Sequence, residues 1–255
     1  MDGRIVIRGL RKEFPGAGGA APLRVLDGVD VAIEDKELVC ILGPSSCGKS
    51  TLLNVLAGLD RAYTGEILLD GVPLARERRL RIGYLFQEAR LLPWLDAERN
   101  IDFALGSCGI PRTQWPAVKD RYLAMTGLAA FRTYYPHQLS GGMRQRLALA
   151  RALAVEPDVL LMDEPFSGLD ELTARKMRMD LLAIWRSAKK TILFVTHNAY
   201  EATYLADRIL IMTRRPGRIQ DEVTVKIPRP RDYDDPAVFE LSRAVVRNYL
   251  DTVAE

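Results

Sequence analysis

The sequence has few cysteines, no long apolar runs and little net charge. Its three cysteines, Cys40, Cys47 and Cys108, are too few and too scattered for a disulfide framework or a metal cluster, and they indicate reduced thiols in a cytosolic protein. No run approaches the roughly 18 apolar residues of a membrane-spanning helix, and the N-terminus lacks an apolar core behind positive charges. We therefore expect a soluble chain without a signal peptide, whose role at a membrane would depend on a partner.

The charges nearly cancel, because 36 basic and 33 acidic residues leave a net charge of +3. Nucleic-acid-binding proteins usually concentrate excess Lys and Arg on one face, so this balance argues against nucleic acid as a partner. A short basic run at 76–81 contains Glu77 and is typical of a solvated surface rather than of a phosphate-backbone site. The 255 residues suffice for one large domain or two small ones.

Short apolar, β-branched runs alternate with helical patterns, which predicts an α/β layered fold. Helical spacing is clearest at 49–57 and 143–153. The runs near residues 40, 160, 193 and 210 are almost wholly apolar, as strands buried on both faces of a parallel sheet are. The predicted strands lie at 5–7, 38–42, 66–69, 159–162, 191–196 and 208–212.

The character of the sequence changes between Gln87 and Ser140, where β-branched runs give way to Trp, Pro and Leu at helical spacing. We interpret this stretch as a helical insertion, after which the α/β core resumes near Ala154. The Gly/Pro/Ala-rich loop 15–22 indicates a flexible hairpin excursion. Beyond Lys226 a Pro-rich extended linker leads to a short amphipathic helix near 238–250.

A phosphate-binding motif follows one of the apolar strands. The segment GPSSCGKS at 43–50 fits the pattern G-x-x-x-x-G-K-[ST] and opens a helix. Gly43 and Gly48 allow backbone angles that turn successive N–H groups toward a phosphate, Lys49 would reach the β- and γ-phosphates, and Ser50 would ligate Mg²⁺. The alternative is a plain Gly-rich turn between strand and helix; the flanking strand and helix favour the phosphate loop.

Two carboxylates end the buried strand near residue 160. Isolated acids at a strand end are usually solvated, but beside a phosphate loop Asp163 is placed to hold Mg²⁺ and Glu164 to polarise the attacking water as general base. His197 follows the strand at 191–196. A histidine in that position is as often structural as functional, so its role rests on the remaining motifs.

With the segment LSGGM at 139–143 the sequence resembles the ABC transporter ATPase family. The alternative for this segment alone is a helix N-cap at Ser140, which is compatible with the resemblance because both use a helix N-terminus. The motifs that match the family, in order along the chain, are the phosphate loop at 43–51, Gln87 in YLFQE, LSGGMRQR, LLMDEP, SGLD at 167–170 and His197.

The resemblance implies a P-loop NTPase (RecA-like) α/β core with an antiparallel β subdomain and an inserted α-helical ABC signature subdomain. The core would comprise 1–86 and 154–226, the signature subdomain 87–153, and a C-terminal extension 227–255. ATP and Mg²⁺ would be the cofactors. The residues that would contact ATP are Phe14, Gly43, Pro44, Ser45, Ser46, Cys47, Gly48, Lys49, Ser50, Thr51, Gln87, Ser140, Gly141, Gly142 and Asp170.

Individual roles follow from the same resemblance. Phe14 would stack on adenine and Thr51 would support the α-phosphate. Gln87 would sense Mg²⁺ and the γ-phosphate, and His197 would contact the γ-phosphate. The Mg²⁺ ligands would be Ser50, Gln87 and Asp163, and the catalytic groups would be Glu164, His197, Gln87 and Lys49.

In this family two cassettes dimerise head to tail around two ATP molecules. Ser140, Gly141 and Gly142 would bind the ATP of the opposite subunit, and Asp170 would communicate across that interface. A single cassette per chain requires a second copy or a paralogue, and we favour a homodimer at the cytoplasmic face of the inner (plasma) membrane.

A finer likeness to the nitrate, sulfonate and taurine importer ATPases lies in segments 86–101, 135–146 and 214–232. The partners would then be transmembrane permease subunits and, indirectly, a solute-binding protein. The apolar patch at 91–94 would receive the permease; alternatively, Trp94 packs within the helical subdomain.

The sequence departs from the family pattern at a few positions, namely Ser46, Met143, Ser167, Gly168 and Asn198. None of them removes a catalytic group. Two other classes are less compatible with the sequence. An ABC-type ATPase acting on nucleic acid is disfavoured by the single cassette and the balanced charge, and a non-hydrolysing cassette is disfavoured by the intact Glu164 and LSGG segment.

Overall fold

The computed structural model describes all residues except 1–2, 17, 19–20, 77–79, 189 and 255. Parts of the predicted hairpin loop 15–22 and of the basic run 76–81 therefore lie outside the described residues. The chain forms two compact units. The first unit comprises residues 1–79 and 191–255, and the second unit comprises residues 80–190.

One sheet of the first unit is antiparallel. Its strands lie in the order β2-β1-β4-β5. Buried apolar side chains of β1 and β2, such as Ile5, Leu10 and Ile33, form one face of this sheet. The strands are β1 (Ile5–Phe14), β2 (Leu23–Ile33), β4 (Thr64–Leu69) and β5 (Val72–Pro73).

The other strands of the first unit lie in the order β10-β9-β3-β8, with β3 parallel to both β8 and β9. Every residue of β3 and β8 is buried, as the apolar runs predicted. Because Leu42 pairs with Thr196, both strands end at the same edge, where the segments after residues 42 and 196 begin. The strands are β3 (Leu38–Leu42), β8 (Thr191–Thr196), β9 (Arg208–Met212) and β10 (Ile219–Thr224).

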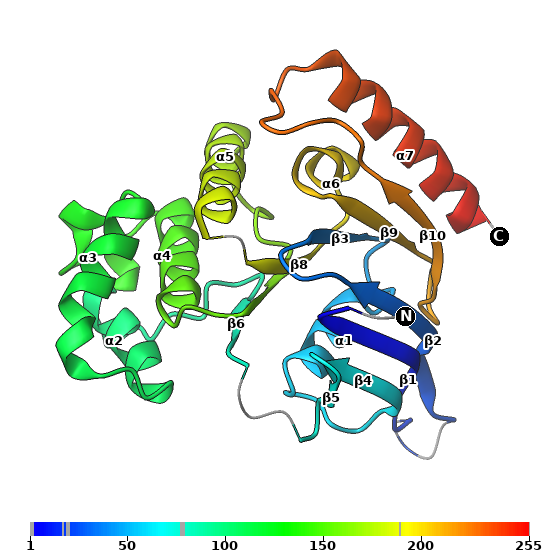
Figure 1. The fold of residues 1–255 in the computed structure, drawn as a ribbon, viewed down its shortest axis with the longest axis horizontal. Helices are drawn as coiled ribbons and strands as arrows, with labels where there is room; N and C mark the ends of the chain where they lie inside the picture. Colours follow the sequence, from blue (N-terminus) through cyan, green and yellow to red (C-terminus); the bar gives the residue numbers. More distant parts are fainter. Residues whose placement is uncertain (1–2, 17, 19–20, 77–79, 189, 255) are drawn as a thin grey trace. The chain divides into compact units, whose positions relative to one another are not determined.

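Three helices complete the first unit: α1 (Lys49–Leu56), α6 (Ala199–Leu205) and α7 (Pro236–Ala254). The last helix is longer than the predicted 238–250 and packs against α6 and β9 (Figure 1).

The Pro-rich segment before α7 is extended but docked, because buried Arg231 donates to the carbonyl oxygens of Thr203, Tyr204 and Ala206 at 3.0, 2.9 and 2.8 Å. These carbonyls belong to the last turn of α6 and its cap, and the last carbonyls of a helix generally need donors from outside the helix. Arg231 thus caps α6 and fixes the segment.

The second unit joins a parallel strand pair, β6 (Ile82–Leu85) and β7 (Val159–Asp163), to a group of helices. The stretch 87–140, where the sequence predicts a helical insertion, contains α2 (Ala97–Ser107) and α3 (Trp115–Met125). Both contact α4 (Gly141–Ala154), which also contacts β6 and α5 (Glu171–Ala188). The predicted fold class, an α/β core with an antiparallel sheet and inserted helices, is confirmed.

Among the described residues, no helix combines the length and the apolar character that crossing a membrane requires.

Candidate active site

The predicted phosphate loop connects β3 to α1, and its backbone is left-handed at two positions. Ser46 has φ 66° and Gly48 has φ 111°. A Cβ atom at Gly48 would lie 2.7 Å from Leu26 Cδ2, so a side chain there would have to displace Leu26 in addition to adopting an unfavourable φ. Left-handed residues within a loop turn neighbouring N–H groups to one side, which suits an anion. The loop therefore has the conformation of a phosphate cradle.

Lys49 begins α1, and its side chain folds over the loop. It is only 5% exposed, and its Nζ donates to the carbonyl oxygens of Gly43 and Pro44 at 2.8 and 2.9 Å. The ammonium group is thus held at the loop rather than in solvent. The next two side chains, Ser50 and Thr51, are exposed and half-buried.

The remaining loop residues differ in accessibility. Pro44 is half-buried, Ser45 and Ser46 are exposed, and Cys47 is buried. Phe14, the predicted adenine contact, ends β1 with 38% of its surface exposed. Its ring is therefore available to a ligand.

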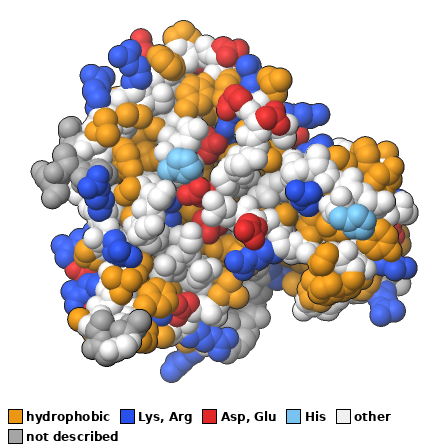
Figure 2. Space-filling model, turned by 180° about the vertical axis from the view of Figure 1, so that it is seen from behind, with side chains coloured by type: hydrophobic (Ala, Val, Ile, Leu, Met, Phe, Trp, Pro, Cys, Tyr) orange, Lys and Arg blue, Asp and Glu red, His pale blue; other side chains and the backbone are white. Residues whose placement is uncertain are grey.

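His197 directly follows β8, and the Gly43 N–H donates to the Thr196 carbonyl oxygen at 3.4 Å. The phosphate loop and the residue before His197 are thus joined by a backbone hydrogen bond. Both histidines of the chain, pale blue in Figure 2, are exposed.

Asn198, one of the departures from the family pattern, caps α6. Its side-chain oxygen accepts from the N–H groups of Tyr200 and Glu201 at 2.9 and 3.2 Å. Asparagine and aspartate are about equally good N-caps, so α6, which follows His197, is capped by Asn198 as it would be by aspartate.

The two predicted carboxylates lie at the end of β7 in the second unit. Asp163 is buried, and Glu164 is half-buried with a left-handed backbone at φ 43°. Such conformations cost free energy in residues other than glycine and cluster at functional sites. Burial, and then the nearby Asp163 carboxylate, raise the pKa of Tyr84 on β6. The N–H and hydroxyl of Ser167 donate to the Glu164 carbonyl oxygen at 3.1 and 3.0 Å and fix this turn.

Gln87 lies in an exposed segment after β6 that α4 holds in place. Gln145 Nε2 donates to the Phe86 carbonyl oxygen at 3.3 Å, and Arg151 donates to the carbonyl oxygens of Ala89 and Arg90 at 3.0 and 2.8 Å. The signature helix and the segment of Gln87 are thereby connected within one unit.

The signature segment forms the exposed N-terminus of α4. Ser140 is the N-cap, and its Oγ accepts from the Met143 N–H at 3.3 Å. The capping interpretation made from sequence is therefore correct. Gly141 is exposed and Gly142 is half-buried.

The signature segment is packed against the start of α5. A Cβ atom at Gly142 would approach Thr173 Cγ2 to 2.7 Å. The side chain of exposed Asp170 accepts from the Thr173 N–H at 3.0 Å, and hydrogen bonding by Thr173 lowers the pKa of Asp170. Thr173 thus brings two predicted dimer contacts, Gly142 and Asp170, close to one another.

Trp94 does not pack within the helical part of the second unit, because 69% of its surface is exposed. Of the two alternatives for Trp94, internal packing is therefore excluded. Pro93 is also exposed, whereas Leu91 and Leu92 are half-buried.

Asn100 fixes the loop beside Trp94. It is fully buried and exchanges hydrogen bonds with the backbone of Leu92 at 2.8 and 3.2 Å. Sequence reasoning missed Asn100 and Arg151, because an Asn or Arg on a helix carries no local signal of which distant carbonyl it meets.

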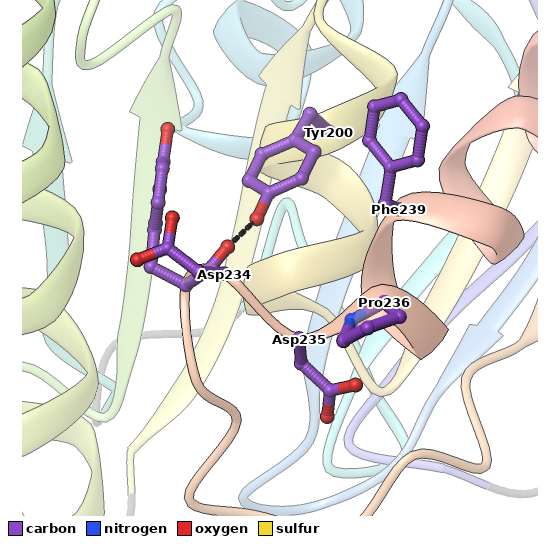
Figure 3. A pocket seen from close by; sticks show the side chains of 6 residues that line it. Tyr200, Asp234, Asp235, Pro236 and Phe239 are labelled. Carbon is purple, nitrogen blue, oxygen red and sulfur yellow. Dashed lines mark hydrogen bonds between the residues drawn. The ribbon is translucent and has the colours of Figure 1, made fainter.

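A separate cavity of about 490 Å³ lies between α6 and the start of α7. It is lined by aromatic and acidic side chains, and the Tyr200 hydroxyl donates to the Tyr233 carbonyl oxygen (Figure 3). None of the predicted ATP contacts lines it. The lining residues are Tyr200, Tyr233, Asp234, Asp235, Pro236 and Phe239.

Comparison with known proteins identifies the same family. Residues 26–167 match the ABC transporter family. An uncharacterised ABC transporter ATP-binding protein of Methanocaldococcus jannaschii is 39% identical over 99% of this chain and 94% of its own length. The aliphatic sulfonates import ATP-binding protein SsuB of Bacillus cereus is 39% identical over 89% of both chains.

Solved structures agree with the sequence relatives. A dimeric ATP-binding cassette in a post-hydrolysis state, bound to ADP and Pi, superposes with a TM-score of 0.77 at 29% identity, covering 88% of this chain and 100% of that one. The family match, the relatives and the phosphate-loop geometry agree. The chain belongs to the ABC transporter family and is one of its ATP-binding cassettes, with ATPase activity.

Proposed function

We propose that this chain is the ATP-hydrolysing subunit of a bacterial ABC importer that takes up nitrate, a sulfonate, taurine or a similar small solute through a membrane permease. The importer role rests on one observation: relatives 39–44% identical over 84–89% of this chain are named as aliphatic sulfonate import proteins. The segments that resemble such importers in sequence, at 86–101 and 135–146, include Gln87, Trp94 and the signature.

Binding of ATP begins at the phosphate loop. The left-handed Ser46 and Gly48 turn loop N–H groups toward the β-phosphate, and Lys49, already held over the loop, exchanges its two carbonyl partners for phosphate oxygens. Thr51 supports the α-phosphate and Phe14 stacks on adenine.

Glu164 acts as the general base that takes a proton from the attacking water, while Gln87 and His197 contact the γ-phosphate. The left-handed backbone at Glu164 and the two hydrogen bonds from Ser167 fix the direction in which its side chain leaves the strand end. A positioned base contributes about 10²- to 10⁴-fold to such a reaction.

Mg²⁺ would be held by Ser50, Gln87 and Asp163 together with phosphate oxygens. A hydroxyl, an amide oxygen and a carboxylate fit this ion, because Mg²⁺ prefers oxygen ligands. When bound, the ion neutralises charge that develops on the phosphates.

Two copies of the chain form a head-to-tail homodimer around two ATP molecules. Support comes from the exposed N-terminus of α4 at Ser140 and Gly141, since a helix N-terminus favours a phosphate. Dimeric cassettes among the solved structures are further support. Hydrolysis of ATP removes the γ-phosphate that holds the copies together, and the dimer reopens.

The exposed Trp94 and Pro93 receive the permease at the cytoplasmic face of the plasma membrane, and a solute-binding protein acts indirectly through that permease. The support for this role is that both side chains are exposed and that Trp is enriched at protein interfaces.

Reconstitution tests the proposal. The chain is co-expressed with the permease encoded beside it and placed in proteoliposomes with the matching solute-binding protein. ATP hydrolysis should rise when nitrate, a sulfonate or taurine is supplied. Basal ATP hydrolysis that none of these solutes stimulates, or a permease that exports them, would contradict the importer role while leaving the ATPase activity intact.

A further inference from the structure

The first unit buries an ammonium group behind the predicted adenine contact. Lys12 on β1 is 4% exposed. Its Nζ donates to Asp60 Oδ1 and to the Ala62 carbonyl oxygen, both at 2.7 Å. Burying a charge is costly unless it is paired and hydrogen-bonded, so the surroundings of Lys12 must hold it in one place.

The partners of Lys12 directly follow the phosphate-loop helix. Asp60 and Leu59 donate their N–H groups to the Asn54 carbonyl oxygen at 3.2 and 3.0 Å, which anchors them to the end of α1. Asp60 Oδ1 also accepts from the Ala62 N–H at 3.0 Å. Lys12 therefore ties β1 to the helix that begins at Lys49, and both belong to the first unit.

The same ammonium lies against Phe14. Lys12 Nζ is 4.6 Å from the centroid of the Phe14 ring, within the range of a cation–π contact. Because 38% of Phe14 remains exposed, the contact leaves part of the ring open to a second group. An exposed aromatic side chain without such a contact would sample several rotamers, and ordering it on ligand binding would cost entropy.

We propose that Lys12 is a positioning residue for ATP: anchored by Asp60 and the Ala62 carbonyl, its ammonium fixes the Phe14 ring as a stacking platform at a set distance from the phosphate loop. This inference rests on the proposed role of Phe14 as the adenine contact. The ligand of this platform would be a nucleotide, because the Phe14 ring would contact the planar base while the phosphates bind at the phosphate loop.

The strand itself supplies a contrast. Arg8 and Glu66 also pair across β1 and β4, at 2.9 Å, but both side chains are about half exposed. An exposed ion pair of this kind contributes little. Lys12 differs because it is buried and touches an aromatic ring. Its hydrogen bond to Asp60 lowers the pKa of that carboxyl.

The test separates base binding from phosphate binding. Lys12→Met removes the charge and keeps the stem, Asp60→Asn weakens the anchor, and Arg8→Met is the matched control on the same strand. For each variant, binding of ATP and of inorganic tripolyphosphate is measured with the purified chain, followed by KM and kcat for ATP. Melting temperatures establish that the variants are folded.

Lys12→Met should raise the Kd and KM for ATP about tenfold, a loss in the range of one base–aromatic stacking contact. Asp60→Asn should show a smaller loss in the same direction. Binding of tripolyphosphate and kcat at saturating ATP should change less than about twofold, and Arg8→Met should match the parent chain. In the Phe14→Ala background, Lys12→Met should have no further effect, because both act through the ring.

Equal losses for ATP and tripolyphosphate would show a general structural role and overturn the proposal. Unchanged ATP affinity in both Lys12→Met and Asp60→Asn would also overturn it, as would additive effects of Lys12→Met and Phe14→Ala. If Lys12→Met does not fold, Asp60→Asn decides alone. Failure of the proposed function has a different signature: the parent chain itself would not prefer ATP to tripolyphosphate.

Discussion

The two glycines at the ends of α1 offer a direct measurement of how tightly the phosphate loop is enclosed. Gly48 precedes the helix with φ 111°, and Gly58 follows it with φ 70°. A Cβ atom at Gly48 would meet Leu26 Cδ2 at 2.7 Å and Val25 Cγ1 at 3.1 Å, whereas a Cβ atom at Gly58 would meet no atom within 4 Å. Gly48→Ala and Gly58→Ala therefore both carry a backbone cost, which is the larger at φ 111°, and only Gly48→Ala adds a packing cost.

The magnitudes follow from these contacts. A left-handed backbone costs a residue other than glycine about 1–2 kcal/mol; this applies to Gly58→Ala and is a lower bound for Gly48→Ala, because φ 111° lies beyond the left-handed region. Forcing an extra methyl group into packed surroundings costs about 1–3 kcal/mol more, and only Gly48→Ala carries this cost. We expect Gly58→Ala to lose about 1–2 kcal/mol of unfolding free energy and Gly48→Ala about 2–5 kcal/mol. Because relief of the contact shifts the buried Leu26 side chain or the loop itself, Gly48→Ala should also weaken ATP binding more than tenfold.

Urea unfolding gives the two stabilities, and titration with ATP gives the affinities at a temperature where both variants are folded. Gly58→Ala is the control for the backbone cost and should bind ATP like the parent chain. Equal destabilisation by the two substitutions, or parental ATP affinity in Gly48→Ala, would refute the claim that packing against β2 determines the loop.

Three further outcomes are expected. Glu164→Gln should lower ATP turnover about 10²- to 10⁴-fold. It should also trap an ATP-bound dimer, because the contacts to the phosphates are retained. Turnover at the parental rate would show that Glu164 is not the general base. Ser140→Arg should abolish ATP-dependent dimerisation in gel filtration with little change in nucleotide binding by the monomer; normal dimerisation would refute the cross-subunit contact. Arg231→Met should reduce the unfolding free energy by about 2–4 kcal/mol in urea, because it leaves the carbonyl oxygens at the end of α6 without their charged donor; an unchanged midpoint would show that the segment before α7 adds nothing to stability.

Local sequence signals predicted the elements that carry the candidate site. The apolar runs at 38–42 and 191–196 coincide with β3 and β8, because a strand buried on both faces needs an apolar residue at every position. The helix after the phosphate loop was predicted at 49–57 and begins at Lys49 in the structure. Strand β10, with its exposed acids Asp221 and Glu222, was missed because it carries no such run.

Long-range polar contacts could not be predicted in the same way. Lys12 is an ordinary residue of a polar-looking stretch, and its burial depends on Asp60, which is 48 residues away. Arg231 looks like a linker charge, yet its partners are carbonyl oxygens of α6 about 25–28 residues earlier. In each case the pairing depends on the fold, which places one charged side chain beside one specific set of acceptors, and no periodicity encodes that choice.

The departure at Ser46 bears on what holds the phosphate loop in shape. If glycines alone allowed the loop its conformation, a serine with φ 66° would be expected to shift the backbone, at a cost of about 1–2 kcal/mol. The loop nevertheless keeps its left-handed residue, and Lys49 still reaches the Gly43 carbonyl oxygen at 2.8 Å. The neighbours offset that cost: Leu26 packs against Gly48, and Thr196 accepts from the Gly43 N–H. The backbone of the cradle is therefore held by Leu26 of β2 on one side and by Thr196 of β8 on the other.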